Sequence, residues 1–426
     1  MKTLKDFNFK NKRVLVRCDF NVQLNEKGRI TEDFRIKETL PTIEYLIKKG
    51  AKVILMSHLG RPEETEDKKE RIKKFTLRPV AERLEELLSR RDKSLLQPPS
   101  PVYGTKVEKR AKRSLTSLRS GKRKVKFLPD CIGKEIEKET NEMGEGEIVL
   151  LENLRFYDEE EKNDEGFAKK LVKLGDIYIN DAFSASHRGH ASIAGIPEYL
   201  PSGAGLLLEK EIKVLSKVMQ NPWRPLVVII GGVKIDTKIG VISQFLKKAD
   251  HLLLGGQVAN IILIGKGLSL GKSLTGNKGI VKKIEEINIT NPKLHLPVDG
   301  FISLEKRQDE CFREGAIGTI KKEEKIFDIG PETIKIFSEI IKTAKMILWS
   351  GPLGLSEEKK FEKGTKETAE SIVKNKNAFK IIGGGDTIAA VDKLGLISKF
   401  DHVSTGGGAM LEFLSGEKLP GIEVLK

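Results

Sequence analysis

Cysteine is scarce in this chain of 426 residues, which contains three: Cys18, Cys131 and Cys311. They are odd in number, far apart in the sequence and lack the spacing of a metal site, so neither a disulfide framework nor a cysteine-based metal centre is indicated. We expect the three thiols to be reduced and mostly buried, as in proteins of a reducing compartment.

Long hydrophobic runs are also missing. No apolar stretch approaches the roughly 18 residues that a membrane-spanning helix needs. The first residues, Met1–Asp6, contain no apolar signal core. These two observations predict a cytoplasmic protein with no membrane-spanning segment.

Several catalytic patterns are absent as well. The sequence has no Ser–His–Asp pattern, no cysteine nucleophile with a placed base, and no carboxylate pair suited to glycosidic chemistry. It is rich instead in cations and glycine, with 76 Lys+Arg and 40 Gly. These groups suit phosphoryl transfer, because catalysis of that reaction is mostly positioning and charge stabilisation.

The apolar residues occur in short runs, each followed by glycines or by charged residues, and such runs are typical of strands buried on both faces of a parallel sheet. The runs are Val14–Val16, Val53–Met56, Ile148–Leu151, Ile177–Ile179, Leu226–Ile230, His251–Leu254, Met346–Trp349, Lys380–Ile382 and His402–Thr405. Amphipathic stretches with helical spacing lie between them at Ile36–Lys48, Leu77–Leu88, Asp164–Leu174 and Thr333–Thr343.

Strands that alternate with helices predict an α/β fold, and the length exceeds that of one ordinary core. We therefore expect two doubly wound, mostly parallel-sheet domains that face a cleft and are joined by a helix. The first domain covers residues 1–200, and the second covers 201–407 and includes the linking helix at about 206–220. The short apolar segment Leu419–Lys426 could cap either domain.

Glycines dominate the predicted strand ends of the second half. Gly383, Gly384 and Gly385 precede Asp386 and Thr387, a pattern that lets backbone N–H groups approach a phosphate closely. Asp386 is suited to hold a Mg²⁺ ion carried by a nucleotide. A tight strand–helix turn without a ligand is the alternative interpretation.

A second glycine motif, Gly231-Gly232, is followed by Lys234 and Lys238. On a helix that starts there, the two lysines would share one face and neutralise adjacent phosphates, although a solvated face is the alternative. The segment Gly267–Ser273 resembles a P-loop, but three residues separate its glycines where the motif has four. Gly265–Gly271 is one residue off the dinucleotide fingerprint, and we reject both segments.

The predicted strand ends of the first half carry groups that bind anions. Arginine forks suit phosphate and carboxylate, and Asp19 and Asn21 could fix sugar-like hydroxyls. Parallel strand ends meet at one edge of a sheet, so these groups predict an anion site, although a single arginine alone would usually be a surface group. The set comprises Arg35, His58, Arg61, Arg155, His187, Arg188 and His190.

The net charge of +15 is concentrated in one segment. Between Arg90 and Lys126, thirteen lysine and arginine residues stand against two acidic residues. We interpret residues 91–122 as an exposed basic insertion, either a solvated loop or a contact for RNA, membrane or another acidic polymer. Tyr103 is the lone aromatic residue there, so base stacking has little support.

These motifs, in this order, resemble phosphoglycerate kinase, and the match runs nearly end to end outside the basic insertion. The matching strings are Arg17-Cys18-Asp19-Phe20-Asn21-Val22, Ser57-His58-Leu59-Gly60-Arg61-Pro62, Glu152-Asn153-Leu154-Arg155-Phe156, Asp181-Ala182-Phe183, His187-Arg188-Gly189-His190-Ala191-Ser192, Gly231-Gly232-Val233-Lys234 and Gly383-Gly384-Gly385-Asp386-Thr387.

The resemblance implies a monomeric, hinge-bending kinase of glycolysis that interconverts 1,3-bisphosphoglycerate with ADP and 3-phosphoglycerate with ATP, using Mg²⁺. It also implies a tail, residues 408–426, that returns to the N-terminal domain. Implied phosphoglycerate ligands are Asp19, Asn21, Arg35, His58, Leu59, Gly60, Arg61, Arg155 and Arg188. Implied nucleotide ligands are Lys238, Glu357, Gly384, Gly385, Asp386 (with Mg²⁺) and Thr387, and Arg35, Lys234, Gly384 and Gly385 are the implied catalytic groups.

Two departures from the family pattern lie near the implied nucleotide site. Ser350 stands where the family usually has Asn or another short residue, and Ser356 stands where it commonly has Phe. Serine reaches less far than asparagine, so the first change would weaken a phosphate contact without removing any charged group. Sole or additional nucleic-acid binding through residues 91–122 is the competing function.

Overall fold

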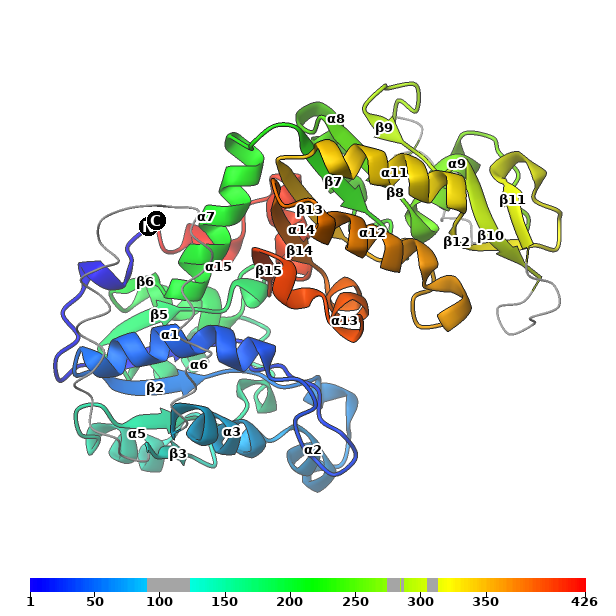
Figure 1. The fold of residues 1–426 in the computed structure, drawn as a ribbon. Coiled ribbons are helices and arrows are strands. Elements are labelled where there is room, and N and C mark those ends of the chain that lie inside the picture. The colour runs from blue at the N-terminus through cyan, green and yellow to red at the C-terminus, as the bar shows by residue number, and fades with distance from the viewer. Residues whose placement is uncertain (90–122, 274–283, 285–286, 305–312) are drawn as a thin grey trace. The chain divides into compact units, whose positions relative to one another are not determined.

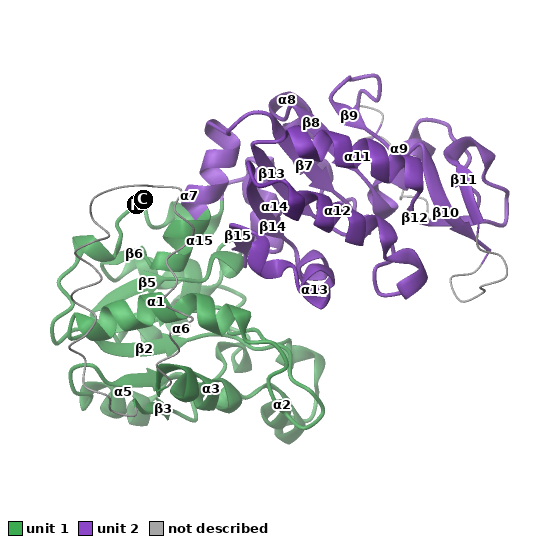
Figure 2. Cartoon of the chain, in the orientation of Figure 1, with its two compact units in different colours: residues 1–211, 419–426 green, residues 212–418 purple. Residues whose placement is uncertain are grey.

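A computed structural model describes residues 1–89, 123–273, 284, 287–304 and 313–426. The basic insertion 91–122 and Cys311 lie outside the described residues. The chain divides into two compact units: unit 1 comprises residues 1–211 and 419–426, and unit 2 comprises residues 212–418 (Figure 2). Among the described residues, no helix combines the length and the apolar character needed to cross a membrane.

Unit 1 is built on a parallel six-stranded sheet with the order β3-β4-β2-β1-β5-β6 (Figure 1). The central strand β1 pairs with β2 on one side and with β5 on the other. The connections that leave β1 and β5 therefore diverge, which opens a crevice at the carboxyl edge of the sheet. The strands are β1 (Arg13–Arg17), β2 (Lys52–Met56), β3 (Val125–Phe127), β4 (Ile148–Leu150), β5 (Ile177–Asn180) and β6 (Ser202–Ala204).

The helices of unit 1 bury one face against this sheet. In α1 the buried residues Ile36, Leu40 and Ile43 recur every three or four positions, as a helix with one apolar face requires. The helices are α1 (Phe34–Lys48), α2 (Lys68–Phe75), α3 (Arg78–Ser89), α5 (Lys134–Asn141) and α6 (Glu165–Val172). Short helical turns η1 (Leu4–Asp6), η2 (Pro62–Glu64), η5 (Leu154–Phe156), η6 (Phe183–Ala185), η7 (Ala191–Gly195) and η8 (Ile196–Glu198) fill the connections.

Unit 2 contains a second parallel sheet, with the order β15-β14-β13-β7-β8-β9. The chain moves outward from β7 through β8 to β9, then crosses to the other side of β7 and continues through β13, so the order reverses between β7 and β13. Ligands of doubly wound sheets bind at this switch point. The strands are β7 (Leu226–Ile230), β8 (His251–Leu254), β9 (Leu294–His295), β13 (Met346–Ser350), β14 (Phe379–Gly383) and β15 (His402–Ser404).

The helices of unit 2 follow its strands, as the α/β prediction requires. They are α8 (Ile239–Lys248), α9 (Gly256–Gly265), α11 (Pro331–Thr343), α12 (Lys363–Lys374), α13 (Gly385–Lys393) and α14 (Gly408–Ser415), with turns η10 (Ile317–Thr319), η11 (Lys359–Phe361) and η12 (Ile397–Lys399). The core of this unit includes the strand residues Val227, Ile347 and Trp349, whose side chains are completely buried. The predicted α/β architecture with two mostly parallel sheets is confirmed.

A small antiparallel sheet in unit 2 was not predicted from the sequence. Its order is β11-β10-β12, and its strands are β10 (Asp299–Ser303), β11 (Arg313–Ala316) and β12 (Lys325–Ile329). These strands lack the continuous apolar runs of the main sheets: β11 alternates half-buried and exposed residues, β10 begins with Asp299-Gly300, and β12 is interrupted by Asp328. A pattern of continuous apolar runs therefore does not indicate them.

The division between the units falls inside helix α7 (Leu206–Gln220), after Glu211. The boundary predicted from the sequence lies earlier, at residue 200. The return to unit 1 begins at residue 419, whereas the resemblance implied a return at 408. Helix α14 packs against α8 in unit 2, which holds residues 408–415 there. Helix α15 (Pro420–Glu423) belongs to unit 1, where the Gly421 N–H donates to the Ser186 carbonyl at 2.8 Å.

Candidate active site

The anion-binding residues expected in the first half follow adjacent strands of the unit 1 sheet. Asp19 and Asn21 come after β1, and His58 comes after β2. Arg155 lies in η5 after β4, and Arg188 lies after β5. Since β4, β2, β1 and β5 are neighbours in the sheet, their carboxyl ends bring these side chains to one edge.

Asp19 and Arg35 form the central ion pair of this edge. The Arg35 Nη1 donates to Asp19 Oδ2 at 2.7 Å and to the Asn21 carbonyl at 3.3 Å. The Ser184 hydroxyl also donates to Asp19 Oδ2. Burial raises the pKa of Asp19, but the Arg35 charge and these hydrogen bonds outweigh it and lower the pKa to about 2. The carboxylate is therefore ionised and fixes Arg35 in place.

A second set of contacts shapes the loop after β2. The Gly60 N–H donates to Asn21 Oδ1 at 2.9 Å, and Arg155 Nη1 donates to the Gly60 carbonyl at 2.8 Å. Asn153 Nδ2 donates to the Leu59 carbonyl at 2.8 Å. Gly60 has φ +62°, and a Cβ there would meet the Phe75 ring at 2.4 Å, so the loop requires glycine.

The arginines of this edge differ in how firmly they are held. Arg155 is 6% exposed and pairs with Glu161 Oε1 at 2.9 Å, yet its buried Nε lacks a hydrogen-bond partner. An unsatisfied buried donor is costly, so this atom favours an acceptor supplied by a ligand. Arg61 has a side chain 68% exposed and pairs with Glu64 at 3.2 Å. Arg188 Nε donates to His187 Nε2 at 3.3 Å.

The histidines do not add positive charge to this edge. Burial, together with neighbouring arginines, lowers the pKa of His58 well below its usual value and lowers the pKa of His187. The same causes lower the pKa of His190 to about 3. These rings are therefore neutral at pH 7 and act as hydrogen-bonding groups, while the arginines carry the charge.

A buried network that was not predicted from the sequence lies beneath this edge and is formed by Arg17, Glu160 and Ser192. All three side chains are almost completely buried. Arg17 and Ser192 stood within recognised motifs, but nothing in the pattern singled them out, and Glu160 is one of four consecutive acidic residues. The structure distinguishes the two neighbours, because Glu160 is buried and Glu159 is exposed.

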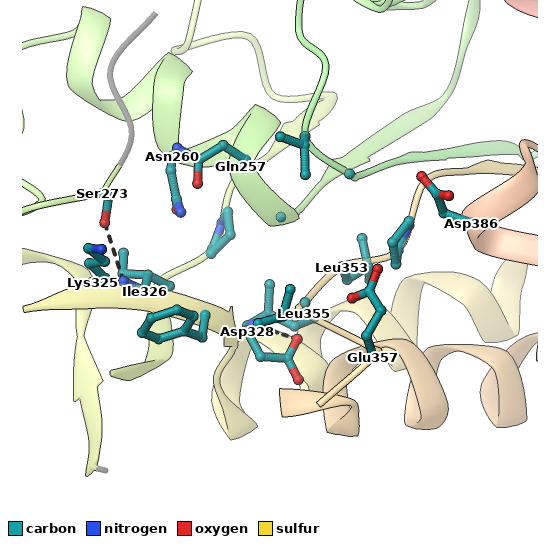
Figure 3. Close-up of a pocket in the computed structure, with 18 of the residues that line it drawn as sticks. Gln257, Asn260, Ser273, Lys325, Ile326, Asp328, Leu353, Leu355, Glu357 and Asp386 are labelled. Carbon is teal, nitrogen blue, oxygen red and sulfur yellow. Dashed lines mark hydrogen bonds between the residues drawn. The ribbon is translucent and has the colours of Figure 1, made fainter. Parts of the chain in front are cut away.

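In unit 2, a pocket of about 320 Å³ lies at the switch point (Figure 3). Glu357 and Asp386 lie on its right in Figure 3, with Asn260 and Ser273 on its left. Glycines and apolar residues, among them Gly232, Gly256, Pro352, Leu353 and Leu355, also line it. A concave, largely apolar site with a few polar groups suits the base and sugar of a nucleotide.

The glycine motif after β14 begins helix α13. Gly384 has φ +93°, and open space surrounds the position of a Cβ on Gly385, so the backbone is accessible at the helix start. Such a start offers free N–H groups and a positive dipole end to a phosphate. Thr387 Oγ1 accepts from the Gly351 N–H at 2.6 Å, which ties this helix to the loop after β13. Asp386 is exposed.

The two lysines after Gly232 do not share a helix face, and this prediction is wrong. Helix α8 starts at Ile239, so Lys234 and Lys238 both lie in the preceding turns. Lys238 is 7% exposed and donates to the Gly231 carbonyl. Burial lowers its pKa to about 8, although the Asp386 carboxylate opposes the shift. Lys234 is exposed.

The loop that carries Glu357 is fixed by strand β12. The Leu355 N–H donates to the Phe327 carbonyl at 2.8 Å, and Asp328 Oδ2 accepts from the Gly364 N–H at 2.6 Å. Burial raises the pKa of Asp328 to about 8.

Within the described residues, no group of three or more His, Cys, Asp or Glu side chains could hold a metal ion alone. The exposed Asp386 carboxylate, in the first turn of helix α13, is an oxygen ligand of the kind that suits a Mg²⁺ ion.

Comparison with known proteins assigns these features to one family. The sequence model of the family described as phosphoglycerate kinase matches residues 4–122 and 102–417. Two similar curated proteins are both named phosphoglycerate kinase. The one from Dictyoglomus turgidum is 44% identical over 426 residues, covering 99% of this chain and 98% of the relative. The one from Borrelia garinii subsp. bavariensis is 45% identical over 433 residues, covering 100% and 99%.

Solved structures give the same result. The phosphoglycerate kinase from Coxiella burnetii aligns with a TM-score of 0.78 and 35% identity, over 100% of this chain and 98% of that one. The phosphoglycerate kinase from Pyrococcus horikoshii OT3 aligns with a TM-score of 0.80 and 33% identity, with the same coverage.

Proposed function

Because this chain belongs to the phosphoglycerate kinase family and is a kinase, we propose that it catalyses Mg²⁺-dependent phosphoryl transfer between 1,3-bisphosphoglycerate and ADP, giving 3-phosphoglycerate and ATP. The observation that carries the proposal is the pair of sites: an arginine-rich strand edge in unit 1 and a glycine-lined pocket in unit 2. The reaction needs one site for the anionic acid and its acyl phosphate and another for the nucleotide, and the two exchange the roles of phosphoryl donor and acceptor with the direction of the reaction.

The unit 1 edge binds the phosphoglycerate in this proposal. Arginine forks bind phosphate and carboxylate oxygens, and the ionised Asp19 with Asn21 fixes the hydroxyl. The partnerless Arg155 Nε supports an anionic ligand at this edge. The proposed ligands are Asp19, Asn21, Arg35, His58, Leu59, Gly60, Arg61, Arg155 and Arg188.

The unit 2 pocket binds the nucleotide. Glu357 accepts from the ribose hydroxyls, and Lys238 with the start of α13 at Gly384, Gly385 and Thr387 binds the phosphates. Asp386 holds the Mg²⁺ ion that accompanies the nucleotide, which bridges phosphate oxygens and offsets their charge.

Transfer requires the bound substrates to meet, so we propose that the enzyme closes by bending and that the phosphoryl group passes directly and in line. Arg35, Lys234 and the N–H groups of Gly384 and Gly385 then stabilise the charge on the transferring group. Closure also expels water, which protects the reactive acyl phosphate from hydrolysis. The buried free thiols Cys18 and Cys131 support a reducing compartment, and we propose a cytoplasmic monomer.

A coupled assay tests the proposed reaction. The purified protein is expected to consume ATP only when both 3-phosphoglycerate and Mg²⁺ are present. Chelation of the metal with EDTA should stop turnover, and excess Mg²⁺ should restore it, because the phosphates would otherwise remain uncompensated. A folded protein without this activity would defeat the proposal.

The strongly basic composition of residues 91–122 favours a second candidate function, retention of RNA beside the kinase activity. Deletion of these residues is expected to abolish RNA retention, measured by filter binding, and to leave kinase turnover unchanged. Retention should fall steeply with added salt, since phosphate contacts release counterions. A full-length protein that retains no RNA at moderate salt would rule this function out.

A further inference from the structure

The network beneath the arginine-rich edge links Glu160 to Arg17 through Ser192. The Ser192 hydroxyl donates to Glu160 Oε1 at 2.5 Å, and the Ser192 N–H donates to Glu160 Oε2 at 2.9 Å. Arg17 Nε donates to the same hydroxyl at 2.8 Å. Relative exposure is 0% for Glu160 and Ser192 and 1% for Arg17, so water does not compete for these bonds.

The far end of Arg17 reaches His58. Arg17 Nη2 lies 3.3 Å from His58 Nδ1. A guanidinium has N–H donors and no acceptor, so Nδ1 must accept this bond and cannot carry a proton itself. In a neutral imidazole the proton then lies on Nε2. The contact therefore selects one of the two neutral tautomers of His58.

The surroundings also keep His58 uncharged. Its ring is 5% exposed, and Arg17, Arg155 and Arg188 each disfavour an imidazolium, while Asp19 alone among the main influences favours it. Burial lowers the pKa well below the usual value. The Nδ1 atom of a second histidine, His190, lies 3.8 Å from Glu160 Oε1.

We propose that Glu160 is a positioning residue that acts through Ser192 and Arg17 to hold His58 as the neutral Nε2–H tautomer, which donates a hydrogen bond to the anionic substrate. The proposal rests on the function proposed above for this edge. Glu160 does not touch the substrate in this scheme. Its carboxylate fixes the serine hydroxyl, the hydroxyl orients the guanidinium, and the guanidinium sets the proton position on the ring.

The arrangement gives the edge one donor whose state does not change near neutral pH. An ordinary histidine loses its charge close to pH 7, which would make substrate binding depend on small pH changes. A histidine held neutral, with its proton fixed on Nε2, donates equally well across that range. Charge stabilisation is left to the arginines, which keep their protons.

The first measurement is ¹⁵N NMR of the histidine rings, with the His58 signals assigned by comparison with His58→Gln. In the wild type, the Nε2–H tautomer is expected to persist without titration between about pH 5 and pH 8. Glu160→Gln should produce a mixture of tautomers or a titrating ring. The matched control is Glu159→Gln, which changes the exposed neighbour and should leave the His58 signals unchanged.

The second measurement is steady-state kinetics. Glu160→Gln is expected to raise the KM for 3-phosphoglycerate about tenfold, the effect of one lost hydrogen bond, with a much smaller change in kcat and in the KM for ATP. Ser192→Ala should give the same pattern if Glu160→Gln fails to fold. A wild-type ring protonated on Nδ1, a His58 that titrates near its ordinary pKa, or variants with unchanged tautomer and KM would each overturn the proposal. The expected tautomer in a protein without kinase activity would support the relay and defeat the proposed function.

Discussion

Replacing Arg35 with alanine is expected to lower kcat about a thousandfold, close to 4 kcal/mol of transition-state stabilisation. Of the two side-chain cations proposed to stabilise the transferring group, Arg35 is the one that the fold holds in place, because its Nη1 is bonded to both Asp19 and the Asn21 carbonyl. Its loss removes a donor to the transferring phosphoryl group and leaves the ionised Asp19 close to an anionic substrate. Both effects raise the barrier.

The measurement is kcat and KM in the coupled assay, with circular dichroism to verify folding. Arg29→Ala removes the same side chain from an exposed position and should leave kcat unchanged. Arg35→Lys should recover little of the kcat lost in Arg35→Ala, because an ammonium group cannot reproduce the two-pronged geometry of a guanidinium. Wild-type turnover in a folded Arg35→Ala variant would exclude Arg35 from the transfer step.

Lys234→Ala is expected to reduce kcat a hundredfold or more while changing the KM for ATP less than about threefold. Lys234 is exposed in the turns before α8, whereas Lys238 is buried and bonded to the Gly231 carbonyl. An exposed lysine without a fixed partner contributes little to ground-state binding. Its contact with the transferring group would form only in the transition state, so the loss should appear in kcat.

The control for this prediction is Lys247→Ala, which changes an exposed lysine on helix α8 and should have no effect. Nucleotide affinity should be measured separately by equilibrium binding, since KM equals a dissociation constant only when chemistry is slow. A loss of ATP affinity as large as the loss of kcat would show that Lys234 binds the ground state instead.

The main architecture was predictable because apolar runs of parallel sheets are continuous. Leu226–Ile230 is completely buried along its length, and residues of that kind in an unbroken run have few structural alternatives. The linking helix was equally clear, since its charged and apolar residues alternate with helical spacing and contain neither glycine nor proline. The arginines and glycines that follow the strands could then be grouped into two predicted sites, because the carboxyl ends of neighbouring parallel strands lie at one edge of a sheet.

Other features depend on contacts that a local pattern does not contain. Lys238 is removed from the predicted helix face by a bond to Gly231, seven positions earlier in the chain. The His58 ring is neutral because of burial and because of arginines contributed by other strands. Glu160 looks identical to its acidic neighbours in the sequence, and only its bonds to Ser192, 32 positions away, distinguish it. Burial and contacts outside the local sequence pattern decide each of these cases.

The return of residues 419–426 to unit 1 has a consequence for synthesis on the ribosome. Unit 1 is discontinuous, with all of unit 2 inserted between its two segments. Asn180 Nδ2 donates to the Gly421 carbonyl at 3.1 Å. This buried side chain at the end of β5 therefore cannot form this hydrogen bond until a residue 241 positions later has been translated. The nascent unit 1 must therefore remain without its C-terminal segment, residues 419–426, until unit 2 has been translated. During this interval the incomplete unit is most accessible to chaperones and proteases.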